Sequence, residues 1–336
     1  MRAATLLLFV ALVACAAPQP ATSKVDSTAS GASSKSCLLP VFWHEGRKNQ
    51  VHAAFVSVPD GAVRDVGIVP PLPVSYGASY NPAARKWLGA TRSLVSPDGT
   101  LYAYWTMDPG DFSRSEVRVL DLATGNDNVV YSGTTPYFVI SFDASGLYLV
   151  DAANAKRGLF QNLYRLDLAG GVPRLIPGSD RHMFGWGWLM VTGGEAWGID
   201  YQVQGGDYVY SVVSLDLASG RVTTWLESEA NDLIWPLGLD GLHRLYVGDG
   251  HEIWLVGAPS SKAGLNNADS AGVVATLGGP IGFVSDSHGA FIAGRGAVLH
   301  YPSEQGPVRL PVGPAGTTVF PTGPCGPASA QQGAAT

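Results

Sequence analysis

The chain contains little charge. Asp, Glu, Lys and Arg make up 14% of its 336 residues, whereas about a quarter is usual for a soluble globular domain. The formal net charge is −6, so the chain lacks the basic surface that nucleic-acid binding needs, and we expect no nucleic-acid partner. The apolar run over residues 6–13 is too short to cross a bilayer as a helix.

Cysteine is also scarce, with three in the chain. The first, Cys15, follows Leu12-Val13-Ala14 at the end of the apolar run, and Arg2 supplies the only charge before it. This arrangement resembles a bacterial lipobox, at which a signal peptide is removed and the cysteine becomes the lipidated first residue. An ordinary secretory signal with an incidental cysteine is the alternative. We expect a signal peptide over residues 1–14 and a lipid on Cys15 that anchors the exported protein to the membrane of the bacterial cell envelope.

Two stretches lack the large apolar residues from which a core is built. Residues 16–36 are mainly Ala, Ser, Thr, Pro and Lys, so a flexible tether is expected over residues 15–36 and a disordered tail over residues 326–336. Between them, residues 37–325 are long enough for a single domain with a large core. Cys37 and Cys325 bound this domain, and in an exported chain two leftover cysteines favour a disulfide over a metal site.

A short motif recurs along this domain. Leu-Asp-Leu-Ala occurs at residues 120–123, 166–169 and 215–218, with spacings of 46 and 49 residues. In the clearest copy, a Pro-Asp-Gly turn separates expected strands at residues 92–96 and 101–106, and a Thr-Gly-Asn turn separates strands at residues 116–122 and 128–131. Four strands in a repeat of this length are typical of a propeller blade.

The segments SPDGTLYAYW and EVRVLDLATG of this copy resemble the TolB-like, WD-repeat-like β-propeller repeat of bacterial envelope proteins. The match covers one repeat and implies an all-β fold. Carried along the chain, its strand order predicts a six-bladed β-propeller, with further blades near residues 137–177, 184–227, 233–277 and 280–312. The remaining blade is shared between the N- and C-termini and closes the ring, with strands at residues 317–321, 38–44, 51–58 and 62–66.

This arrangement bears on the two cysteines and on the number of blades. Cys37 and Cys325 both fall at the turn between its first and second strands, so their Cα atoms are expected within bridging range. Seven blades, the alternative, would need residues 67–91 to form a blade alone, and that segment is too short.

The same strand order sorts the loops between two faces. The turns at residues 98–99 and 124–125 are short and belong to what we call the short-turn face. The opposite, long-loop face is expected to carry residues 45–50, 68–91, 106–115, 152–161, 179–183, 201–207, 229–233 and 248–250. Because functional residues usually lie on loops held by a rigid scaffold, we expect the binding site there. Its aromatic and basic candidates are Tyr76, Tyr80, Trp87, Phe112, Arg157, Arg181, His182 and Trp235.

Roles that involve no ligand are the alternatives for some of these candidates. Trp87 and Trp235 are explained equally by a covering role at junctions between blades, and the cluster Asp180-Arg181-His182 by a solvated loop.

The strands expected to line the centre of the ring contain no Asp, Glu, His or Asn, the residues that hold calcium or transfer protons. The seven histidines show no zinc spacing, and no Gly-x-Ser-x-Gly nucleophile motif occurs. We therefore assign no catalytic residue, metal or cofactor. The predicted function is a monomeric, envelope-anchored module that binds or scaffolds a protein, peptide or glycan without turnover. The alternative is a hydrolase or lyase with its acid and base on the long loops.

Overall fold

The structure is a computed structural model that describes residues 36–46, 50–107, 114–151, 162–181, 183–229, 231–249, 253–259, 263–265, 274–276, 279–302 and 307–327. The chain divides into two compact units, Met1–Lys35 and Ser36–Thr336, and the second is described by itself. Its described part consists largely of β-strands. Within it, no helix has both the length and the apolar character needed to cross a membrane.

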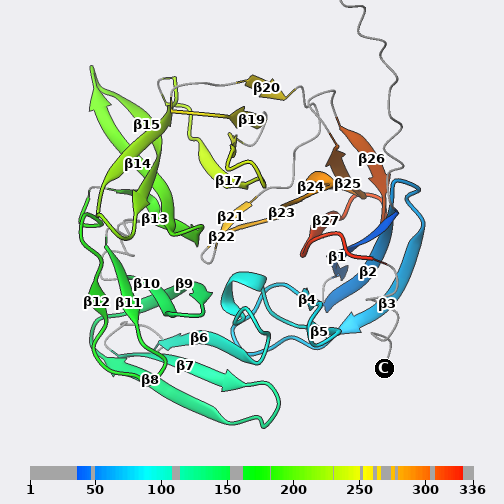
Figure 1. The fold of residues 1–336 in the computed structure, drawn as a ribbon, viewed down its shortest axis with the longest axis horizontal. Coiled ribbons are helices and arrows are strands. Elements are labelled where there is room, and N and C mark those ends of the chain that lie inside the picture. The colour runs from blue at the N-terminus through cyan, green and yellow to red at the C-terminus, as the bar shows by residue number, and fades with distance from the viewer. Residues whose placement is uncertain are drawn as a thin grey trace, which may run out of the picture. The chain divides into compact units, whose positions relative to one another are not determined.

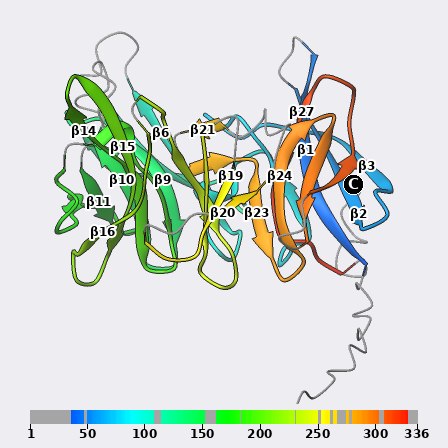
Figure 2. The same cartoon turned by 90° about the horizontal axis from the view of Figure 1, so that it is seen from above.

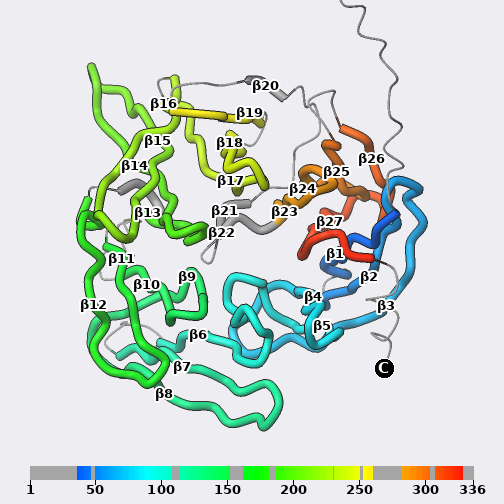
Figure 3. The backbone as a smooth tube through the Cα atoms, in the orientation of Figure 1, coloured from blue at the N-terminus to red at the C-terminus, as the bar shows by residue number. Residues whose placement is uncertain are grey.

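Between β6 and β20, antiparallel sheets of three or four strands follow one another along the chain. The first of these contains β6 (Leu101–Met107), β7 (Ser115–Asp121) and β8 (Asp127–Gly133). Three four-stranded sheets come next: β9 (Tyr137–Asp143), β10 (Gly146–Asp151), β11 (Leu163–Leu166) and β12 (Arg174–Leu175); β13 (Met183–Thr192), β14 (Glu195–Gln204), β15 (Asp207–Asp216) and β16 (Val222–Glu227); β17 (Trp235–Leu239), β18 (Leu245–Gly248), β19 (Ile253–Val256) and β20 (Ala263–Leu265). In Figures 1 and 3 these sheets lie in chain order around the centre of the view, as in a β-propeller.

Strand β7 shows how the sequence pattern builds a sheet. Val117 and Val119 are buried, while the alternate residues Glu116 and Arg118 are half-buried on the other side. Arg118 lies 2.7 Å from the Glu116 carboxylate and 3.2 Å from that of Asp127 on the neighbouring strand β8. Period-two alternation therefore sends the valines into the core and pairs the charged groups across the strands.

The Leu-Asp repeat is a turn signal. Asp121 accepts hydrogen bonds from the backbone N–H groups of Ala123 and Thr124. Asp216 makes the same pair of bonds and a third to the hydroxyl of Ser219. Backbone bonds lower the pKa of the Asp121 carboxyl, and the Ser219 hydroxyl followed by backbone bonds lowers that of Asp216. The repeat thus marks tight turns before β8 and β16 and does not by itself indicate a ligand.

The two ends of the described chain meet in one sheet. Strand β27 (Thr318–Pro321) pairs antiparallel with β1 (Cys37–Glu45), which continues the sheet to β2 (Gln50–Val58) and β3 (Val63–Val69). Figure 2 shows β1 and β27 side by side. Beyond β27 the sheet continues to β24 (Gly289–Arg295), β25 (Ala297–Tyr301) and β26 (Val308–Pro311), and β23 (Phe283–Asp286) also pairs with β24. The short strands β21 (Val274–Thr276) and β22 (Gly279–Ile281) pair with each other.

Cys37 and Cys325 form a disulfide in this sheet. Their Cα atoms are 5.4 Å apart, although 288 positions separate them in the sequence. Next to the bridge, Leu38 and Gly326 exchange backbone hydrogen bonds of 2.8 and 3.1 Å. The first and last strands of the fold are therefore held together both covalently and by main-chain pairing.

Two expected elements differ in the structure. Residues 92–96 do not form a strand: Arg92–Leu94 is a 3₁₀ turn, and only Val95 makes a bridge, to Tyr102. The reason is local, because the N–H groups of Leu94 and Val95 bond to carbonyl groups three residues earlier, which replaces the ladder bonds of a strand. Within residues 67–91, a two-stranded hairpin forms from β4 (Ser79–Asn81) and β5 (Lys86–Leu88).

Candidate binding site

The aromatic pair Tyr80 and Trp87 belongs to the core. The sequence placed both on an exposed face, but their exposed fractions are 3% and 8%. Their ring centroids are 5.7 Å apart, and both rings contact Phe55 of β2, at 5.0 and 5.4 Å. This corrects the prediction: the β4–β5 hairpin folds its aromatic side chains against β2, where they bury a large apolar area. In the structure, Trp87 therefore has the covering role that was the alternative to a binding role.

The other candidates do not assemble into a site in the described part of the chain. Trp235 is half-buried and packs against two core clusters. Tyr76 is 67% exposed, and Arg181 forms an ion pair with Asp200 at 3.0 Å, but neither lines any of the three cavities described below. The remaining three lie outside the described residues: Phe112, Arg157 and His182.

The β4–β5 hairpin reaches the face opposite to the one expected. Residues 68–91 were assigned to the long-loop face, yet the amide of Asn81 lies against Gly99, in the short turn before β6. A Cβ on Gly99 would overlap that amide, and Gly99 has φ +74°, so both the space and the backbone require glycine. Asn81 also accepts the N–H of Ala84 at 2.9 Å, which closes the hairpin turn. The hairpin therefore belongs to the short-turn face.

A cavity of about 400 Å³ opens at this place, and we call it the mouth cavity. Its walls come from the hairpin, from the 3₁₀ turn and the turn that follows it, from the end of β9 and from β13. Hydroxyl and amide groups are contributed by Ser79, Asn81, Ser93, Ser96 and Ser141; the other lining residues are Tyr80, Pro82, Ala83, Arg92, Val95, Pro97, Phe142 and Val191. Three of these polar groups already have protein partners: Asn81 accepts from Ala84, Ser96 donates to Asp98, and Ser141 donates to the Val191 carbonyl. The cavity thus combines polar groups with apolar wall.

A smaller cavity of about 110 Å³, the inner cavity, shares part of this wall. It lies among β1, β23, β27 and the 3₁₀ turn, and its lining includes Phe42, Phe283 and Pro321. Arg92 and Ser93 line both cavities. Arg92 therefore stands where the wider mouth cavity and the narrower inner cavity share a wall.

Arg92 is a cation without an acidic partner among the described residues. Arg92 is exposed, so solvent reaches its side chain, and the protein around it lowers the pKa of the guanidinium below its usual range by reducing its hydration. A Cβ built on Gly323 would lie 3.7 Å from Arg92 Nη1, so the guanidinium extends to the segment between β27 and Cys325. The arrangement places a positive charge, still accessible to solvent, at the wall of both cavities.

A third cavity, the cleft, is larger at about 640 Å³ and lies between the turns that follow β17 and β23. Two carboxylates line it, and both are already engaged. Asp240 accepts two backbone N–H groups and pairs with Arg244 at 2.8 Å. Asp286 accepts the N–H of Cys325 at 2.6 Å and contacts His288. These carboxylates shape the turns, which leaves little capacity for a ligand.

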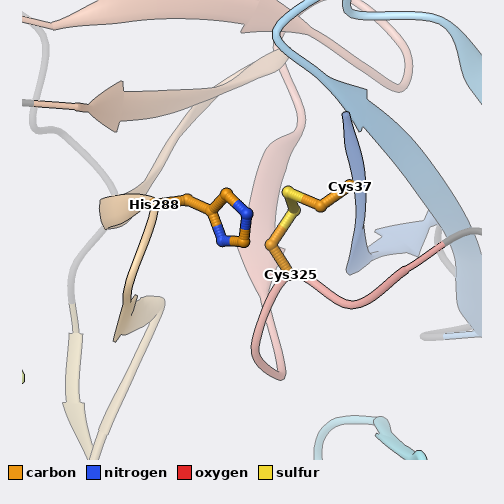
Figure 4. A group of neighbouring side chains, drawn as sticks. All are labelled: Cys37, His288 and Cys325. Atoms are coloured by element: carbon orange, nitrogen blue, oxygen red, sulfur yellow. A yellow bond between two sulfur atoms is a disulfide. The ribbon is translucent and has the colours of Figure 1, made fainter. Parts of the chain in front are cut away.

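His288 lies beside the disulfide, as Figure 4 shows. Its ring and the sulfur atoms of Cys37 and Cys325 fall within 4.8 Å of one another, and its Nδ1 lies 3.1 Å from Asp286 Oδ1. Because metals bind thiolates and the two sulfur atoms are bonded to each other, this group cannot supply a Cys₂His metal site while the disulfide is formed.

Sequence reasoning missed Arg92 as a site residue. The sequence did contain a signal, because Arg92 is the first residue of the strand expected at residues 92–96, and the strands expected to line the centre of the ring contain no Asp, Glu, His or Asn. A single charged residue among strands that otherwise lack charge is a candidate for a functional role.

No family model matches the chain, and no curated protein matches it. Several solved structures are similar in part. The β-propeller domain of the Trilobed protease from Pyrococcus furiosus is 12% identical, with 83% of each chain covered and a TM-score of 0.44. A putative TolB from Agrobacterium tumefaciens is 14% identical, with 86% of this chain and 99% of that chain covered and a TM-score of 0.42. An oligogalacturonate lyase from Vibrio parahaemolyticus is 10% identical over 81% and 74%, with a TM-score of 0.36. At these values the description of the fold rests on the strand pairing alone.

Proposed function

We propose that the chain is a six-bladed propeller, with β27 and β1–β3 as one blade, that acts as a non-catalytic binding module. Its ligand, a protein, peptide or glycan, enters the mouth cavity. The observation that carries this proposal is the mouth cavity itself, which is about 400 Å³ and is lined by five serine and asparagine side chains beside apolar wall. Such a mixture is typical of sites that orient a ligand.

The titratable groups of the mouth cavity favour binding over catalysis. Its described lining contains only Tyr80 and Arg92 as ionisable side chains. Burial raises the pKa of Tyr80, so the phenol stays protonated near neutral pH, and arginine stays charged. General acid–base catalysis needs a group whose pKa lies near the working pH. In the cleft, the two carboxylates that a hydrolase or lyase could use, Asp240 and Asp286, are held by other groups.

Blocking the mouth cavity tests this function. Ala83 is exposed on the hairpin turn and lines the cavity, so Ala83→Trp should fill the entrance and weaken binding about tenfold or more. Peptide and glycan arrays probed with the full chain supply the ligand, and titration of the best binder measures the loss. Ala123→Trp, in the exposed turn between β7 and β8, is the matched control. Equal binding by both variants, or turnover of the ligand by the purified protein, would refute the proposal.

The proposal includes anchoring. Cys15 carries a lipid and residues 16–36 tether a monomeric propeller to the cell envelope, as supported by Leu12-Val13-Ala14-Cys15 and the composition of the segment after it.

We expect Cys15→Ser to move the protein from the membrane fraction to the soluble fraction of cells, because the variant has no residue to acylate. Fractionation followed by immunoblotting measures this, and Ser23→Ala in the tether is the control. Retention of the Cys15→Ser protein in the membrane fraction would show that Cys15 is not the anchor.

A further inference from the structure

We propose that Arg92 binds a carboxylate of the ligand, and that this carboxylate is the C-terminal group of a peptide whose last side chain occupies the mouth cavity. The inference rests on the proposed binding function and adds the chemical group that is recognised.

The position of Arg92 is fixed by the backbone around it. The 3₁₀ turn Arg92–Leu94 is closed by the hydrogen bonds from Leu94 to Thr91 and from Val95 to Arg92. Leu94 is 3% exposed and anchors the turn in the largest core cluster. Because the turn is anchored while the Arg92 side chain lines two cavities, the guanidinium is presented from a rigid element.

The charge of Arg92 is not balanced by the protein around it. Within the described part of the chain, its guanidinium makes no ion pair and no hydrogen bond, and loss of hydration is the cause that lowers its pKa. Because Arg92 lines both cavities, its planar guanidinium can donate two parallel hydrogen bonds to the two oxygens of a carboxylate bound there.

The two cavities differ in size, which favours a terminal group. Arg92 lines both cavities, of which the inner cavity measures about 110 Å³ and the mouth cavity about 400 Å³. A carboxylate at the end of a chain can reach Arg92 while the rest of the ligand stays in the wider cavity. The hydroxyl groups of Ser79, Ser93 and Ser141 line that cavity and suit the polar backbone of a peptide.

The walls favour a peptide over an acidic sugar. The more accessible apolar residues Pro82, Pro97 and Val191 give the mouth cavity an apolar wall for an aliphatic side chain next to the carboxylate. Sugars are usually held by stacking on an exposed aromatic face, but the two aromatic rings of the described lining, Tyr80 and Phe142, are only 3% and 6% exposed.

The test compares N-acetylated tetrapeptides that end in Ala, Val, Leu or Phe, each as the free acid and as the amide. Calorimetric titration of the full chain should show that at least one free acid binds about tenfold or more tightly than its amide, as expected for a charged hydrogen-bonded pair. Arg92→Met keeps the length of the side chain and should abolish this preference, and Arg92→Lys should retain part of it. No preference for the free acid in the natural chain would overturn the proposal. A hexuronic acid disaccharide that binds through Arg92 when no peptide does would overturn the peptide assignment.

Thermal unfolding without ligand supplies a second measurement. If Arg92 is kept for a ligand, Arg92→Met should unfold at the same temperature as the natural chain or higher, since an unbalanced charge has been removed. A clear fall in Tm would show that Arg92 serves the fold and would overturn the proposal. The binding function proposed above can be judged separately from the role of Arg92. Loss of binding in Ala83→Trp with an unchanged preference in Arg92→Met leaves the mouth cavity as the site and removes only the role of Arg92.

Discussion

The double variant Cys37→Ser/Cys325→Ser is expected to lose about 4–5 kcal/mol of unfolding free energy. The bridge closes a loop that spans 288 positions of sequence, and the entropy that a cross-link removes from the unfolded chain grows with the logarithm of loop length. Both cysteines are also buried, at 3% and 7% exposure, in the cluster around β1, β2 and β27. Loss of the bridge therefore frees the ends of the chain at the place where they pair.

Guanidinium unfolding of the oxidised natural chain and of the double variant measures the difference. Adding a dithiol reductant to the natural chain should reproduce the loss, and the reductant should leave the double variant unchanged. A difference below about 1 kcal/mol, or free Cys37 and Cys325 thiols in exported protein mapped under non-reducing conditions, would contradict the prediction.

Trp188→Ala is expected to lower the free energy of unfolding by about 3–5 kcal/mol, which is the second large effect that we predict. Trp188 on β13 is fully buried, and its indole N–H donates to the carbonyl of Ser179 at 3.1 Å. It belongs to the largest core cluster, which includes residues of β9, β10, β14 and β15. Truncation leaves a cavity in the packing between neighbouring sheets and removes one of two donors to the Ser179 carbonyl, the other being the N–H of Arg181.

A series of variants at Trp188 tests whether the lost unfolding free energy comes from packing. Trp188→Phe retains most of the apolar volume and loses the N–H group, so its cost should fall between zero and that of Trp188→Ala. Val172→Ala is the control, because Val172 is 85% exposed and surface truncations change stability by about 0.5 kcal/mol or less. Equal unfolding free energies for Trp188→Ala and the control would disprove the packing role.

Strands were predictable where a local pattern dictates the structure. In two of the three copies of the Leu-Asp repeat, Asp121 and Asp216 accept the next backbone N–H groups, so these copies predict turns for a local reason. In the third copy, the Asp167 carboxylate pairs with Arg174 instead. The alternation in β7 predicts a strand for a similar local reason. The pairing of β27 with β1 follows from the requirement that a terminal strand needs a partner.

The candidate site was less predictable, because it depends on contacts between distant segments. Nothing within residues 79–88 indicates that Tyr80 and Trp87 pack on Phe55, or that Asn81 contacts Gly99. An exposed loop and a folded-back hairpin have similar compositions. The 3₁₀ turn at Arg92 likewise replaces a strand through bonds that compete locally with the ladder. The side of the fold that carries the cavities could therefore not be read from loop length.

The disulfide between Cys37 and Cys325 joins the two ends of the folded domain, so the chain between these residues forms a closed covalent ring. A protease that cuts once in any loop between these residues opens the ring into a single linear molecule, and no fragment is released. The strands on both sides of the cut remain connected through the sulfur atoms, and they can re-form their pairs without a bimolecular encounter. One proteolytic cut therefore leaves a chain that can regain its fold, and two cuts are needed to release a fragment.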